Sequence, residues 1–160
     1  MELYLLRHGI AEDVRPGQRD ADRALTGEGK KKLRAVLKSA REAGLKPDLI
    51  LTSPLRRAVE TATVAAEVLD YGGELFRTKT LQPDAKPEAA WEEVRLHREA
   101  AQILLSGHEP LFSELTAYLL CAPSLRVDFK KGALVRIDFD AVGPVPRGVL
   151  KWMLAPKLAG

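Results

Sequence analysis

Short apolar runs alternate with longer amphipathic segments along the 160 residues of this chain, and this alternation limits the folds open to it. The strongest runs, residues 3–6, 49–53 and 102–107, have the length and composition of buried strands. Between them, apolar side chains recur at helical spacing. Such alternation is typical of an α/β fold. We therefore expect a three-layer sandwich, with a mostly parallel central sheet and helices on both faces.

Turn-forming residues give the bounds of these elements. We expect helices between Thr26, as N-cap, and Gly44, and from Pro54 to Gly72. The remaining expected elements are a short strand at 74–78, a charged helix at 88–99, a helix opened by Pro110, and a C-terminal hairpin of residues 132–139 and 148–154. No repeat or inter-domain linker interrupts the chain, so we expect one domain over residues 1–160.

Composition excludes several classes of function. The net charge of +3 comes without a basic stripe interleaved with aromatic residues, which does not favour nucleic-acid binding. The single cysteine, Cys121, cannot form an internal disulfide, and its apolar surroundings predict a place in the core. No apolar run approaches the roughly 20 residues that a membrane span needs, and no signal sequence is recognisable at the N-terminus. We expect a cytoplasmic protein that binds neither nucleic acid nor membrane.

Nitrogen-rich side chains follow each of the three strong strands. The first strand ends in Arg7-His8-Gly9, the second leads into a helix that carries Arg57, and the third is followed by His108. In open α/β sheets, ligands bind beyond the carboxyl ends of the strands. If the three strands are neighbours, Arg7, His8, Arg57 and His108 meet in one crevice, and two helix N-termini favour an anion there.

This combination of side chains suits phosphoryl transfer. Arginine forks hold phosphate oxygens, and they spread the charge of a phosphoryl group in transit. A neutral histidine, favoured by nearby arginines, is a nucleophile toward phosphorus, and a second one can hydrogen-bond an equatorial oxygen. Because the arginines supply positive charge, we expect neither metal nor cofactor. Two histidines are also too few for a zinc site, and no glycine-rich nucleotide motif is present.

Four segments in a fixed order strengthen this interpretation. LLRHGIA, RALTGEG, LILTSPLRRAVETA and LLSGHEP, between residue 3 and about residue 120, together resemble the histidine phosphatase superfamily, whose fold is phosphoglycerate-mutase-like. The resemblance implies that His8 is a nucleophile that becomes transiently phosphorylated, and that Arg7, Arg57 and His108 complete the phosphate pocket. It also implies a further pocket arginine, Arg23. Gly9 is expected to let the backbone turn close to the phosphate.

Within that superfamily the chain is similar to the short bacterial protein-phosphohistidine phosphatases, the SixA type. The segment before the third strong strand is too brief for a pocket cover, and LQPDAKPEAAW is similar to a pattern of the short group. The resemblance implies a phosphohistidine-bearing partner protein, of the phosphotransfer or phosphocarrier kind, as substrate. A phosphatase for a small phosphomonoester and a non-catalytic phosphate-binding module remain alternatives, and a mutase is the least favoured.

One departure from the superfamily concerns the general acid. Many members carry a glutamate after the second helix, whereas this chain offers only Glu74, Asp84 and Glu88, none in a matching context. The phosphorus–nitrogen bond of phosphohistidine is itself labile to acid, so a strong protein acid is dispensable for that substrate. Asp84 is the candidate we name for a role toward the substrate.

Overall fold

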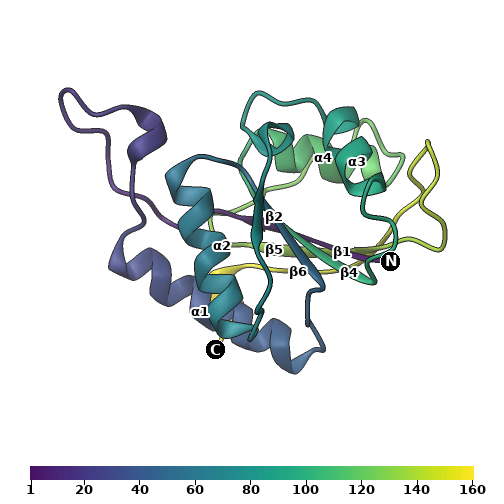
Figure 1. The fold of residues 1–160 in the computed structure, drawn as a ribbon, viewed down its shortest axis with the longest axis horizontal. Coiled ribbons are helices and arrows are strands. Elements are labelled where there is room, and N and C mark those ends of the chain that lie inside the picture. Colours follow the sequence, from purple (N-terminus) through teal and green to yellow (C-terminus); the bar gives the residue numbers. More distant parts are fainter.

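A six-stranded sheet with helices on both sides forms the frame of the molecule, in a computed structural model that describes all residues from Met1 to Gly160 (Figure 1). The strands are β1 (Glu2–Arg7), β2 (Leu49–Thr52), β3 (Leu75–Arg77), β4 (Gln102–Gly107), β5 (Leu134–Asp138) and β6 (Val149–Leu154). The helices are α1 (Gly27–Glu42), α2 (Arg56–Val68), α3 (Pro87–Arg95) and α4 (Leu111–Leu119). Three short 3-10 turns are η1 (Asp20–Asp22), η2 (Lys79–Leu81) and η3 (Pro156–Leu158).

The sheet order, β3-β2-β4-β1-β5-β6, makes the three strong strands neighbours. β4 pairs in parallel with both β1 and β2, whereas β5 runs antiparallel to β1 and to β6. The register aligns Arg7 with Gly107 and Thr52 with Ser106, so the three carboxyl ends form one continuous edge. The predicted α/β sandwich with a mostly parallel sheet is confirmed.

Two apolar clusters hold the layers together, one on each face of the sheet. On one face, Leu33 and Leu37 of α1 and Ala62 of α2 pack against the sheet, and on the other Trp91 of α3 and Leu115 of α4 do so. All five side chains are buried because the apolar positions of each helix fall on its inner side. Thr26 caps α1 by accepting a hydrogen bond from the Gly29 N–H at 2.9 Å, as predicted.

Two details differ from the expectations. The helix expected over 88–99 ends at Arg95, and His97 lies in the following turn, its ring 6.1 Å from that of Phe76. The core position expected for Cys121 is wrong, because this residue is exposed. It follows the end of α4 in a left-handed turn with φ of 53°, and its thiol donates a hydrogen bond to the Pro146 carbonyl at 2.8 Å. The apolar residues before it, which suggested burial, belong to the helix.

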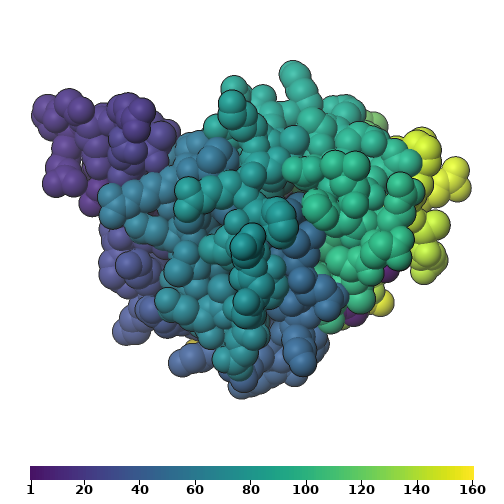
Figure 2. Space-filling view, in the orientation of Figure 1, coloured from purple at the N-terminus to yellow at the C-terminus, as the bar shows by residue number.

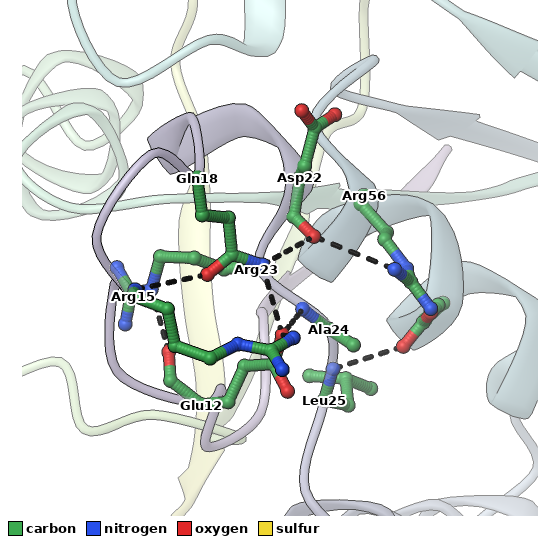
Figure 3. A network of polar contacts seen from close by, with 9 residues as sticks. Glu12, Arg15, Gln18, Asp22, Arg23, Ala24, Leu25 and Arg56 are labelled. Carbon is green, nitrogen blue, oxygen red and sulfur yellow. Dashed lines mark hydrogen bonds and ion pairs between the residues drawn. The ribbon is translucent and has the colours of Figure 1, made fainter.

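The loop from residue 10 to residue 25 extends outward beyond the carboxyl end of β1 (Figures 1 and 2). A polar network gives it shape: the Glu12 carboxylate accepts hydrogen bonds from Arg15 and Gln18, and Arg23 Nε donates to the Glu12 carbonyl at 2.7 Å (Figure 3). The loop therefore has a defined conformation built from its own side chains. None of the helices has the length and apolar character needed to cross a membrane.

Candidate active site

His8 lies at the centre of the carboxyl edge of the sheet, directly after β1. Its backbone N–H donates to the Gly107 carbonyl at 2.9 Å, which extends the β1–β4 pairing by one residue. Its ring Nδ1 lies 2.7 Å from the Gly9 carbonyl oxygen. A carbonyl can only accept, so Nδ1 carries the hydrogen and Nε2 keeps its lone pair. The backbone thus selects the tautomer that a nucleophilic Nε2 requires.

The surroundings of His8 keep its ring neutral. Burial lowers the pKa of His8 from 6.5 to about 4, although the hydrogen bond to Gly9 opposes this effect, and the charges of Arg57, Arg7 and Lys131 lower it further. At neutral pH the lone pair on Nε2 is therefore available. The direction agrees with the prediction from the sequence, but burial contributes more than the arginines.

His108 lies beside His8, with ring centroids 5.1 Å apart. Its Nε2 is 2.8 Å from the Ser53 hydroxyl, which also accepts a hydrogen bond from the Leu55 N–H. The serine hydroxyl has no acceptor other than Nε2 within hydrogen-bond distance, so it donates to Nε2, which leaves the hydrogen of a neutral His108 on Nδ1. Burial, followed by the charges of His8 and Arg57, lowers the pKa of His108 to about 3. His108 is thus a neutral hydrogen-bond donor.

Two guanidinium groups flank the histidines. Arg7 donates to the Phe129 carbonyl at 2.6 Å, and Arg57 donates to the Asp20 carbonyl at 3.1 Å. The Nε atoms of Arg7 and Arg57 are buried without a hydrogen-bond partner, and so is Nδ1 of His108. Unpaired buried donors are costly, and each one calls for an explanation. Three such nitrogen atoms around His8 are suited to the oxygens of a tetrahedral anion.

Arg23, the fourth predicted cation, takes part in the site through Asp20. The Asp20 carboxylate lies 3.1 Å from Arg23 and 3.2 Å from Arg57, so one acidic side chain joins the two arginines. The hydrogen bond from Arg23, ahead of the charge of Arg57, lowers the pKa of Asp20. Arg23 is therefore tied into the loop of residues 10–25, while Asp20 partly neutralises Arg57.

Gly9 has a packing role that the sequence did not suggest. Its φ is not positive, and a Cβ at this position would lie 2.8 Å from Cδ1 of Leu33. Its N–H donates to the Thr61 hydroxyl at 3.1 Å, so this group is already paired within the protein. Gly9 lets the chain that carries His8 approach α1 closely.

Asp84 is a predicted site residue whose side chain has no polar contact with the four central side chains. It lies exposed in the turn between η2 and α3, and it makes no hydrogen bond or ion pair with them. The carboxylate that contacts the site is Asp20, which sequence reasoning missed along with Ser53 and Thr61. Only the spacing of Asp20 and Arg23, three residues apart in a polar loop, hinted at their pairing.

The assembled edge of the sheet can bind a tetrahedral anion and attack it. Burial and positive charge are combined there: His8 and Arg57 are each 6% exposed and His108 is 1% exposed. No group of three or more histidine, cysteine, aspartate or glutamate side chains is arranged to hold a metal ion. The chemistry available from these residues is nucleophilic attack by His8 on an anion held by arginines.

Comparison with known proteins identifies the family. Residues 3–82 match the histidine phosphatase superfamily (branch 1). An uncharacterized protein of Picosynechococcus sp. is 36% identical over 115 residues, which make up 71% of this chain and 70% of that relative.

Solved structures share the whole fold. The protein histidine phosphatase SixA in complex with tungstate has a TM-score of 0.87 at 22% identity, and the match covers 98% of each chain. SixA from Agrobacterium tumefaciens has a TM-score of 0.81 at 25% identity, with 97% of each chain covered. The alpha-ribazole phosphatase from Shigella flexneri has a TM-score of 0.71 at 21% identity, covering 98% of this chain and 97% of that one. Sequence and fold agree: this chain belongs to branch 1 of the histidine phosphatase superfamily and has the fold of its SixA-type members.

Proposed function

We propose that this phosphatase removes the phosphoryl group from phosphohistidine on a partner protein. In the first step, solvent protonates the free ring nitrogen of the substrate phosphohistidine, Nε2 of His8 attacks phosphorus, and the bond from phosphorus to the substrate ring breaks, so that the substrate imidazole leaves in its neutral form. In the second step, water attacks the phosphohistidine on the enzyme, releasing inorganic phosphate and restoring neutral His8. The observation that carries the proposal is the Nδ1 hydrogen bond to Gly9, which leaves the lone pair on the ring nitrogen that can attack.

The other site residues have supporting roles in this mechanism. Arg7 and Arg57 hold the equatorial oxygens and offset the charge that develops on the phosphoryl group. His108 donates from Nδ1 to one of these oxygens, and Ser53 fixes its ring. Arg23 acts on the pocket through Asp20. Gly9 supports the close approach of the nucleophile segment to α1. Asp84 is not needed for this substrate, because the substrate ring, once protonated by solvent, is already a good leaving group.

A partner protein as substrate is supported by the type of fold. The SixA proteins have the highest TM-scores of the structures compared above, and one of them is described as a protein histidine phosphatase bound to tungstate, a tetrahedral oxyanion like phosphate. Phosphatases of small molecules share the fold with lower scores, as the alpha-ribazole phosphatase does. A small phosphomonoester is therefore the second candidate, with the same residues in the same roles.

The test is a time course with a phosphohistidine-bearing carrier protein and a generic phosphoester. We expect the wild-type protein to release phosphate from the carrier, and His8→Ala to release none. His97→Ala, a histidine outside the site, is the matched control and should keep the activity. Hydrolysis of the phosphoester alone, still dependent on His8, would point to the small-molecule substrate. If His8→Ala still released phosphate from both the carrier protein and the phosphoester, His8 would not be the nucleophile.

A further inference from the structure

A groove of about 690 Å³ borders the candidate site on the side of Arg7. We call it the lysine groove, because Lys32, Lys130, Lys131 and Lys157 line it together with Arg7. Asp128 is the one carboxylate in the lining. Most of the lining comes from α1, the segment before β5, and η3, which meet beside the carboxyl end of β1. A single phosphate group would fill only a small part of this space.

Hydrogen bonds attach the wall of the groove to the nucleophile segment. The Gly132 N–H lies 3.1 Å from both the Arg7 and the His8 carbonyl oxygens, and Arg7 donates to the Phe129 carbonyl at 2.6 Å. Lys130 and Lys131 stand between these two anchors. Their positions relative to His8 are therefore fixed, and a partner held in the groove lies next to the phosphoryl site.

The positive charge of the groove is only partly neutralised within the protein. Lys32 pairs with Glu28 at 3.2 Å and Lys130 with Asp128 at 3.1 Å, and both pairs are exposed. Exposed pairs contribute little free energy, so they exchange readily with other carboxylates. Lys131 and Lys157 are exposed and form no ion pair. A cleft lined by one sign of charge attracts a partner of the opposite sign.

We propose that the lysine groove binds an acidic segment of a partner protein, beside the point where that partner presents its phosphohistidine. This inference rests on the proposed function and names the kind of surface that the substrate must carry. Apolar side chains also line the groove, among them Leu158, which is 70% exposed. The lining thus suits a peptide that mixes carboxylates with apolar side chains. It contains no aromatic residue on which a nucleic-acid base could stack.

The first experiment measures binding without catalysis. The probes are a short fluorescein-labelled peptide rich in Glu and Leu and a twin in which Gln replaces Glu, neither of them phosphorylated. By fluorescence anisotropy, we expect the wild-type protein to bind the Glu peptide about tenfold more tightly than the Gln twin at low salt. This preference should shrink as salt shortens the Debye length. Equal affinity for the two peptides would overturn the proposal.

Charge reversal locates the binding site. Lys131→Glu with Lys157→Glu should abolish the preference for the Glu peptide. Lys38→Glu with Lys46→Glu is the control with the same change of charge at two exposed lysines outside the groove, and it should keep the preference. Circular dichroism confirms that each variant is folded. If both double variants lost the preference for the Glu peptide equally, the preference would depend on the net charge of the protein and not on the lysine groove, and the proposal would fail. The groove could instead bind a single-stranded oligonucleotide or an anionic vesicle. If either bound more tightly than the Glu peptide, and through the same lysines, a protein partner for the groove would be excluded.

A second measurement separates this inference from the proposed function. The Glu and Gln peptides are each prepared with one phosphohistidine, and kcat/KM is compared within each protein. We expect the wild-type protein to prefer the Glu peptide about tenfold, and the Lys131→Glu, Lys157→Glu variant to lose this preference. If no phosphohistidine peptide is hydrolysed while lysine-dependent binding persists, the proposed function fails and the groove assignment stands. If hydrolysis is rapid without preference for Glu, the groove assignment fails and the proposed function stands.

Discussion

At the scale of single residues, the site depends on keeping two histidines neutral among cations. His8 and His108 are buried, and their rings lie 5.1 Å apart beside Arg7 and Arg57. Burial removes the water that would stabilise an imidazolium ion, and the arginines add repulsion. Both effects favour the neutral ring, which is the form that the proposed mechanism requires of His8 as nucleophile and of His108 as hydrogen-bond donor.

The low pKa of His8, about 4, predicts an unusual dependence of activity on pH. The values of kcat/KM for a generic phosphoester, after correction for the titration of the substrate, should stay on a plateau from pH 7 to about pH 5 and fall as His8 takes its proton near pH 4. A histidine with its ordinary pKa would begin to lose activity near pH 6.5. NMR of the His8 ring gives the same midpoint independently, with His8→Asn to assign the signal. A midpoint near pH 6.5 in both measurements would contradict this account of the site.

The Asp20 carboxylate predicts a gain of anion affinity on its removal. It lies 3.2 Å from Arg57 and competes with phosphate for that guanidinium, while being 57% exposed itself. Asp20→Asn should therefore tighten the binding of inorganic phosphate by about threefold, because Asp20 is solvent-screened and its ion pair with Arg57 is weak. Isothermal titration calorimetry measures this effect. Asp13→Asn, an exposed carboxylate of the same loop, is the control and should change the affinity less. Weaker binding in Asp20→Asn would show instead that Asp20 orients Arg57.

At the scale of elements, the site depends on a close contact between the start of α1 and the segment after β1. A Cβ on Gly29 would overlap the backbone oxygen of Ile10, and one on Gly9 would press against Leu33. Backbone atoms cannot yield as a flexible side chain can. The two glycines therefore let α1 lie against the segment that carries His8, and this packing holds His8 at the edge of the sheet.

Gly29→Ala tests this contact. Alanine favours a helix by roughly 1 kcal/mol over glycine. The overlap with Ile10 costs more, so we expect a net loss of about 2 kcal/mol in the free energy of unfolding, together with reduced activity. Denaturant unfolding followed by fluorescence measures the loss. Gly27→Ala, in the same turn of α1 but with open space around it, should leave the stability unchanged or slightly higher. Equal stability of the two variants would exclude the proposed overlap.

Some features of these elements were predictable from the sequence, and others were not. The order of strands and helices predicted the sheet, and the carboxyl ends of parallel strands then placed Arg7, His8 and His108 together. The pairing of Asp20 with Arg57 was not predictable, because it depends on the path of a polar loop without periodicity. The exposure of Cys121 was missed for a similar reason, since a left-handed turn turned it away from the core that its neighbours suggested.

At the scale of the whole molecule, the candidate catalytic groups and the positive charge lie at one edge of the sheet. Some groups at this edge lower the free energy of unfolding. Three buried nitrogen atoms without partners and two neutral histidines lie at that edge, whereas the two apolar clusters on the faces of the sheet carry the packing. Unfavourable groups of this kind persist only where the rest of the fold compensates for them. The cost appears as a dependence of stability on pH.

This dependence has a definite sign. In the unfolded chain each histidine takes a proton near pH 6.5, whereas in the folded protein His8 does so near pH 4 and His108 near pH 3. At a pH between the folded and the unfolded pKa values, the unfolded state binds more protons than the folded state, so the free energy of unfolding falls as the pH falls. From pH 7 to pH 5 the loss from the two histidines together should reach roughly 4 kcal/mol. Urea unfolding at the two pH values measures it.

Substitution of the histidines identifies the source of the loss. The variant His8→Gln with His108→Gln should show a much smaller decrease between pH 7 and pH 5, because neither position can then take a proton. His97→Gln, outside the site, should keep the decrease of the wild-type protein. The carboxylates do not mimic the effect, since unfolded Asp and Glu titrate mainly below pH 5. If the double variant were as sensitive to pH as the wild-type protein, the two histidines would not be held neutral by the fold, and the tautomer argument for His8 would lose its basis.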